Sequence, residues 1–261
     1  MTTIKSAFRV STFHKREGLI FCERQGAAMK KTTFYTELAY LLGIYLISLG
    51  AACMVAADFG VSMVVAPAYL VYLKLSTTAL PFFTFGMAEY TLQALLLILM
   101  CLILRRFRVY YLFSFLTAVF YGLLLDANTA LVGLLPANLM SVRVLLYLGG
   151  LVFCAVGVAM VFHTYIPPEV YELFVKELAP ICHMPDHRLK TIYDLTSCVL
   201  SVLISFAFFG LGRFEGVKWG TVICAVMDGW MIGVCSRWME KHFAFRDRLK
   251  LRPFFESRQD A

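Results

Sequence analysis

Several acidic residues interrupt the apolar stretches of this chain, and these side chains are the best placed to do chemistry there. Asp228 is the clearest case, because it lies in the middle of the run TVICAVMDGWMIG. A carboxylate at the centre of a membrane-spanning helix costs about 2.5–3.5 kcal/mol on insertion scales, so such a residue usually faces a cavity or a partner. We expect Asp228 either to lie on a substrate or proton path or to hold helices together as a hydrogen-bonded or ion-paired acid.

Glu89 and Asp194 lie nearer the ends of such stretches. Lys190 precedes Asp194 by about one helical turn, and Gln93 follows Glu89 by the same distance. Residues four apart share one face of a helix, so each acid has a polar neighbour beside it. Structural pairing and a place on a substrate or proton path are both open for these two acids.

Two further candidates, Glu169 and Glu172, lie in the short segment YIPPEVYELFVKELAP. Pro167 and Pro168 suit the start of a helix, and acids near that start are favoured by the helix dipole. The apolar residues that follow fall on one face, namely Val170, Leu173, Phe174 and Leu178. The pattern favours an amphipathic interfacial helix. The alternative is a half-helix that dips inward and presents Glu169 or Glu172 to a site.

The elements that must position these acids are membrane-spanning helices. The chain is 60% hydrophobic and 16% charged, whereas soluble domains are about 25% charged. Six apolar runs are each long enough to span a bilayer, and they are Leu38–Ala57, Phe82–Leu104, Val109–Leu125, Val144–Phe162, Ile192–Phe209 and Trp219–Cys235. Backbone hydrogen bonds must close within each span. The sequence therefore predicts an all-α membrane protein with six transmembrane helices.

The segment Asp58–Lys74 differs from these spans. Its uncharged part, Phe59–Leu73, is shorter than the about 20 helical residues that cross the hydrocarbon core, and Gly60 and Pro67 interrupt it. Short, Gly/Pro-interrupted apolar segments beside true spans are typical of transporter sites. We expect an interrupted or re-entrant element here, with the Glu169 segment as its counterpart later in the chain.

An internal repeat relates the two halves. Gly43 and Gly50 have the same spacing as Gly150 and Gly157, and the offset between these pairs also relates Gly122 to Gly229. Because each half has an odd number of spans, the second must be inverted relative to the first. We predict two inverted three-helix repeats, about 38–127 and 144–236, each with a short interrupted or interfacial segment. Small residues at this spacing also serve close helix packing.

The two ends of the chain are basic. Residues 1–34 are expected to be a disordered N-terminal segment, with Met29 as an alternative start, and 35–237 to form the membrane domain. Residues 238–261 are expected to be a basic amphipathic tail on anionic headgroups, or else a specific lipid or partner site. Lys and Arg are concentrated in segments that share a side with both ends, so the positive-inside rule places both termini in the cytoplasm. The net charge of +7 therefore does not indicate nucleic-acid binding.

Motifs for catalysis, cofactors and metals are absent from the sequence. There is no GxSxG, HExxH, P-loop or Asp-rich motif, so we expect no enzyme, no catalytic residue and no cofactor. The eight Cys include no CxxC pair and are interpreted as packing residues. Cys182, His183 and His187 share one loop but lack the number and spacing of ligands that a metal site needs.

From Tyr35 to Arg237 the chain resembles the YczE/YyaS/YitT family of bacterial integral membrane proteins. The resemblance is carried by four segments, Ala57–Leu75, Phe162–Leu178, His187–Leu195 and Val217–Gly233. Gly60 and Ser62 match the family's Gly-x-Ser, but the Pro-Trp-Asp that usually follows is replaced by Met, Val and Val. The resemblance implies a bacterial plasma-membrane protein, for which transport is the usual suggestion.

The function predicted from these features is a small secondary transporter or exporter. Its partners would be the lipid bilayer and a small-molecule or ion substrate. A homo-oligomer is expected, because six spans enclose only a narrow path. The candidate path residues are Asp228, Glu89, Asp194, Glu169 and Glu172. The alternative is a non-transporting accessory or regulatory membrane protein that binds a partner through its cytoplasmic loop or tail.

Overall fold

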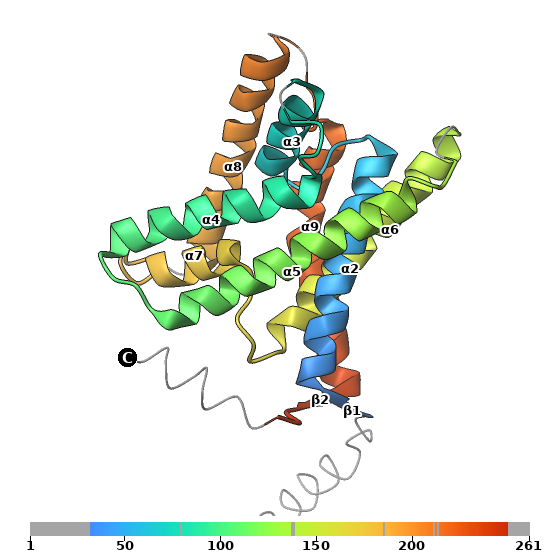
Figure 1. Ribbon diagram of the computed structural model, residues 1–261. Helices are drawn as coiled ribbons and strands as arrows, with labels where there is room; N and C mark the ends of the chain where they lie inside the picture. Colours follow the sequence, from blue (N-terminus) through green and yellow to red (C-terminus); the bar gives the residue numbers. More distant parts are fainter. Residues whose placement is uncertain are drawn as a thin grey trace, which may run out of the picture.

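The computed structural model of the protein describes residues 32–249 except 79, 137–138, 185, 211 and 213, and within them the fold is helical (Figure 1). The helices are α2 (Thr36–Ala57), α3 (Ala66–Thr78), α4 (Phe85–Leu104), α5 (Val109–Val132), α6 (Met140–Phe162), α7 (Val170–Leu178), α8 (Asp186–Phe209) and α9 (Trp219–His242). Two short strands, β1 (Thr32–Tyr35) and β2 (Phe243–Arg246), flank the series. Most of the predicted N-terminal segment and the last residues of the tail lie outside the described residues.

Six of the described helices are long and apolar enough to cross a membrane, as the sequence predicts, and they are α2, α4, α5, α6, α8 and α9. Their bounds differ from the predicted spans where polar side chains find partners. Asp126, the residue after the predicted span Val109–Leu125, lies inside α5. Its carboxylate accepts hydrogen bonds from the Gly86 N–H and the Thr84 hydroxyl, both at 2.7 Å. These bonds hold the start of α4 against α5, and α5 continues to Val132.

The centre of the fold is the antiparallel pair of α2 and α6, which approach each other through glycines. Gly43 lies against Gly157, and Gly50 lies against Gly150. A Cβ on Gly157 would stand 2.6 Å from the Gly43 carbonyl oxygen, and one on Gly50 would stand 2.7 Å from the Gly150 carbonyl oxygen. The predicted role of these glycines in close helix packing is thereby confirmed.

The remaining helices pack around this pair. Helix α5 packs on α2 and α4, and α9 packs on α6. Helix α3 lies against α4 and α8, whereas α7 lies against α4, α5 and α8. One apolar core lies between α2, α4 and α5, around Ile44, Tyr121 and Leu125. A second lies where α7 meets α4 and α5, around Met100, Tyr111 and Leu173.

The segment after α2 is interrupted, as predicted. Asp58 adopts a left-handed backbone conformation (φ 56°) that ends α2, and the chain turns through residues 59–65 before α3 begins. The Asp58 carboxylate forms ion pairs with Arg143 and Lys218. The Val61 N–H donates to the Gly216 carbonyl at 3.2 Å. These contacts fasten the interruption to the loop before α9.

The two described ends of the chain lie together. Strands β1 and β2 pair in parallel, with Thr32 opposite Phe243 (Figure 1). Glu37, in the first turn of α2, accepts the N–H groups of Arg248 and Leu249 at 3.1 and 2.7 Å. This strand pair has no local signal in the sequence, because it joins segments at opposite ends of the chain.

Candidate functional site

Two acids, Glu89 and Glu169, form an inner carboxylate cluster around Gln93. The Gln93 Nε2 donates to the Glu89 Oε1 at 3.4 Å and to the Glu169 Oε2 at 3.0 Å. The Gln93 Oε1 accepts the Val170 N–H at 3.1 Å. Glu89 and Gln93 are both fully buried. A single amide side chain therefore links two acids on separate helical segments and also caps the start of α7.

Local sequence explains how these groups meet. Thr84 is the N-cap of α4 and accepts the Met87 N–H at 3.2 Å. Within that helix Glu89 and Gln93 are four residues apart and therefore share one face. Pro167 and Pro168 come just before α7, and the first N–H groups of a helix lack partners within it. Gln93 supplies one such partner to Val170, and so the α7 N-terminus docks onto α4.

The inner cluster contains buried polar atoms whose hydrogen-bonding capacity is not used. Among the described residues, the Glu89 Oε2 and the hydroxyls of Tyr121 and Tyr171 have no hydrogen-bond partner. The Tyr171 hydroxyl and Glu89 nevertheless lie close enough to influence each other electrostatically. Unused buried donors and acceptors are uncommon and mark a strained or functional site. Here they surround a pair of acids.

Glu169 lies outside the six spans, just before α7. Burial of its carboxyl raises its pKa to about 7, although the Gln93 hydrogen bond opposes this effect. The charge of Glu172 adds to the increase. A carboxyl with this pKa takes up and releases a proton near neutral pH.

An outer cluster surrounds Lys190. The Lys190 Nζ lies 3.3 Å from the Glu172 Oε1 and 3.7 Å from the Asp194 Oδ1. Asp228, from α9, interacts electrostatically with Lys190, Asp194 and Glu172. Its Oδ1 is buried and has no hydrogen-bond partner within the described ranges. This cluster therefore holds three carboxyl groups and one ammonium group.

Helix α7 joins the two clusters. Glu169, at its N-cap, faces the inner cluster, and Glu172, one turn later, faces Lys190. Tyr171 lies between these acids in sequence, and its ring centroid is 6.2 Å from that of Tyr193 on α8. Tyr193 in turn interacts electrostatically with both Glu89 and Asp194. Helix α7 thus carries one acid of each cluster, Glu169 and Glu172.

The structure places the site residues singled out from the sequence in two groups: Glu89 and Glu169 share Gln93, and Glu172 and Asp194 share Lys190. Asp228 interacts with the second group electrostatically. The local pairing of Asp194 with Lys190 is observed as an ion pair. Sequence reasoning missed the bridging role of Gln93 and the place of Tyr171. Gln93 carried a usable signal, since a neutral amide one turn from a buried acid is a ready partner for it.

The second short segment is more enclosed than an interfacial helix. Val170 and Leu173 of α7 are buried, in agreement with the predicted apolar face. Helix α7 nevertheless packs against three helices, α4, α5 and α8. This arrangement favours the alternative in which a short helix presents Glu169 and Glu172 to a site.

Metal binding finds no support in the part of the chain that the structure describes. No group of three or more His, Cys, Asp or Glu side chains there could hold a metal ion.

Comparison with protein families gives one match. A family model described as a family of unknown function, DUF6198, matches residues 34–237. This range begins in β1 and ends within α9, so it includes both clusters. No curated protein and no solved structure matches the chain. Because the family model covers most of the sequence, the chain belongs to the family of unknown function DUF6198.

Proposed function

We propose that the protein is a small secondary transporter or exporter of the bacterial plasma membrane, in which the clustered carboxyls bind protons or a cationic substrate. The observation that carries this proposal is the pair of Glu89 and Glu169 bridged by Gln93, joined through α7 to the cluster around Lys190. The resemblance to the YczE/YyaS/YitT family, for which transport is the usual suggestion, supports the same function.

The inner pair suits proton binding. Two carboxyls in a dry, shared site cannot both ionise cheaply, because like charges at short range and desolvation both favour a protonated form. A proton on Glu89 or Glu169 relieves this conflict. When that proton leaves, the balance of hydrogen bonds at Gln93 changes, and Gln93 also holds the start of α7. Protonation is in this way coupled to the position of α7.

The outer cluster suits a cation. Glu172 and Asp194 pair with Lys190, and Asp228 adds a third carboxyl that interacts with them electrostatically. The ionised cluster therefore has an excess of negative charge that a cationic substrate or a proton can neutralise. Lys190 is held by Glu172 and Asp194 at 3.3 and 3.7 Å. A substrate cation that binds these acids competes with Lys190 for them.

The arrangement of the helices supports the inverted repeat. The glycine contacts of α2 and α6 are reciprocal, since Gly43 meets Gly157 and Gly50 meets Gly150. The short helix of each half packs on a long helix of the other half, α3 on α8 and α7 on α4. Inverted repeats with short segments at their interface are a recurring transporter design. The proposal includes a homo-oligomer, in which other subunits or lipid cover the exposed apolar faces of α8 and α9. It also places both termini in the cytoplasm.

The experiment is transport by the purified full chain in liposomes, measured as current across a solid-supported membrane. An imposed pH gradient is combined with alkali-metal cations, quaternary ammonium ions and ethidium as probes. Glu169→Gln and Asp228→Asn are expected to lower the probe-dependent current by at least tenfold. Their abundance and elution as folded protein are expected to match those of the matched control Glu240→Gln, which changes an exposed acid on α9.

Two outcomes would count against the proposal. Equal loss of folded protein and current in both variants would make the acids structural. The second outcome is that no probe gives a current, while truncation after His242 abolishes the phenotype of the expressing cells and Asp228→Asn does not. It would favour the alternative function, a non-transporting accessory or regulatory membrane protein.

A further inference from the structure

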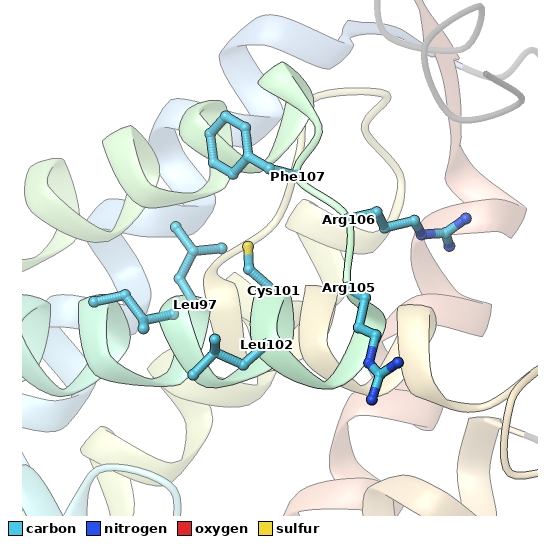
Figure 2. A pocket seen from close by; sticks show the side chains of 7 residues that line it. Leu97, Cys101, Leu102, Arg105, Arg106 and Phe107 are labelled. Carbon is cyan, nitrogen blue, oxygen red and sulfur yellow. The ribbon is translucent and has the colours of Figure 1, made fainter.

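A groove of about 410 Å³ lies where α4 ends and the chain turns toward α5 (Figure 2). Its walls are apolar and its rim is basic, and the lining residues are Leu97, Ile98, Cys101, Leu102, Arg105, Arg106 and Phe107. The groove is on the outer face of α4, where Ile98 and Leu102 are more than half exposed. It is separate from the two carboxylate clusters.

The geometry places the basic groups at one end of the apolar wall. Leu97, Cys101 and Arg105 are spaced four residues apart, so they follow one face of the helix toward its end. Arg105 adopts a left-handed conformation (φ 50°) as the C-cap of α4. Figure 2 shows Arg105 and Arg106 extending from the turn, away from Leu97 and Phe107.

The charges at this end are not balanced. Arg106 pairs with Glu177 at 3.0 Å, and Arg108 lies 3.8 Å from the same carboxylate. Arg105 forms no ion pair with any residue that the structure describes. Arg106 and Arg108 therefore share one carboxylate, and Arg105 is the group left for an external anion.

The depth of the groove fits a lipid. Its apolar wall occupies the last two turns of a membrane-spanning helix, and the rise from Leu97 to Arg105 is about 12 Å at 1.5 Å per residue. That length matches the upper part of an acyl chain below its headgroup. The arginines then lie at the level of the headgroups, where anionic lipids attract basic side chains.

We propose that this groove binds an anionic phospholipid of the surrounding bilayer, with an acyl chain along Leu97, Cys101 and Leu102 and the phosphate at Arg105. A helix from a second copy fits this face less well. Close helix packing in membranes uses small residues, whereas the exposed face of α4 carries bulky ones, namely Leu95, Ile98, Leu99, Leu102 and Ile103.

The test is native mass spectrometry of the delipidated full chain with phosphatidylglycerol and, separately, phosphatidylcholine. The wild type is expected to retain phosphatidylglycerol preferentially. Arg105→Asn is expected to lower its retention about fivefold, the loss of one charge at a headgroup surface, and Asn suits the left-handed backbone at this position. Arg105→Lys is expected to preserve the preference. Leu102→Gln is expected to weaken retention of both lipids, because it interrupts the acyl wall.

Arg237→Gln is the matched control, since Arg237 is an exposed arginine in the last turns of another span. An equal loss in Arg105→Asn and Arg237→Gln would overturn the proposal, because attraction would then come from overall charge. Equal retention of the two lipids by the wild type would overturn it as well. So would protection of the groove by a second copy, seen as a dimer that Leu102→Gln dissociates while lipid retention is unchanged.

Discussion

At the residue scale, the inner cluster depends on one neutral side chain. Gln93 donates to Glu89 and Glu169 and accepts from Val170. An amide can serve both functions at once because it carries donors and an acceptor. A third acid at this position would, when ionised, lack the donors and add like charge. The amide therefore allows two buried carboxyls to share a site.

The protonation of Glu169 predicts a pH dependence of stability. In the unfolded chain its carboxyl ionises at the ordinary pKa of 4.5, whereas in the fold the pKa is about 7. Between these values the folded protein retains a proton that the unfolded chain has released. The stability contributed by Glu169 therefore falls as pH rises through this window and levels off above about 7.

Glu169→Gln removes this contribution. Thermal unfolding of the purified protein, measured from pH 4.5 to above 7, is expected to show a Tm difference between wild type and variant that changes by several degrees. Glu240→Gln is expected to follow the wild type throughout. Parallel Tm curves for wild type and Glu169→Gln would show that the Glu169 carboxyl does not titrate between these limits.

At the scale of elements, the α2–α6 pair makes the approach of two helices depend on individual glycines. A methyl group on Gly50 or Gly157 would press against backbone of the opposite helix. Backbone cannot turn aside as a flexible side chain can, so the helices must separate. Gly149, which is adjacent to Gly150 in sequence, faces open space: an added Cβ would meet nothing within 4 Å.

We expect Gly50→Ala and Gly157→Ala each to destabilise the protein by about 1–3 kcal/mol, the usual cost of overpacking. Gly149→Ala is expected to be neutral or slightly stabilising, because Ala is the better helix former. Thermal unfolding in detergent or nanodiscs measures both effects. Similar loss of stability in all three variants would mean that glycine serves backbone flexibility here and not close packing.

Some of the helices and site residues could be predicted from the sequence, and others could not. The spans, the interruption after α2 and the α7 helix follow from local composition, because length, Gly and Pro act within each segment. Asp228 and Glu89 could be singled out because a charge in an apolar run is costly. The partnership of Gln93 with Glu169, and that of Asp126 with α4, depends on which helices pack together. Such long-range contacts leave no local pattern: the sequence places Gln93 beside Glu89, but it does not show that Glu169 lies against both.

At the scale of the whole molecule, the chain closes on itself at one end of the helices. Strands β1 and β2 form a two-stranded parallel sheet, a structure that is marginal on its own in water. Glu37 adds hydrogen bonds from the backbone of Arg248 and Leu249 and from the Tyr165 hydroxyl. One carboxylate thus ties together the start of α2, the segment after α6 and the segment after β2.

This closure predicts that Glu37 governs the stability of the strand pair. In Glu37→Ala the hydrogen bonds to Arg248 and Leu249 are lost, so the backbone amides of Phe243–Arg246 are expected to exchange with deuterium at least tenfold faster. Amides of Thr32–Tyr35 are expected to follow, because each strand is the other's hydrogen-bonding partner. Hydrogen–deuterium exchange with mass spectrometry measures both segments at once, and Glu240→Ala, a change on the exposed surface of α9, is the control.

Faster exchange in β2 with unchanged protection in β1 would contradict the paired strands and would mean that Glu37 holds only the segment after β2. If both strands loosen while the amides of α2 and α9 stay protected, the closure is a local unit, free to open without unfolding the helices that hold the carboxylates.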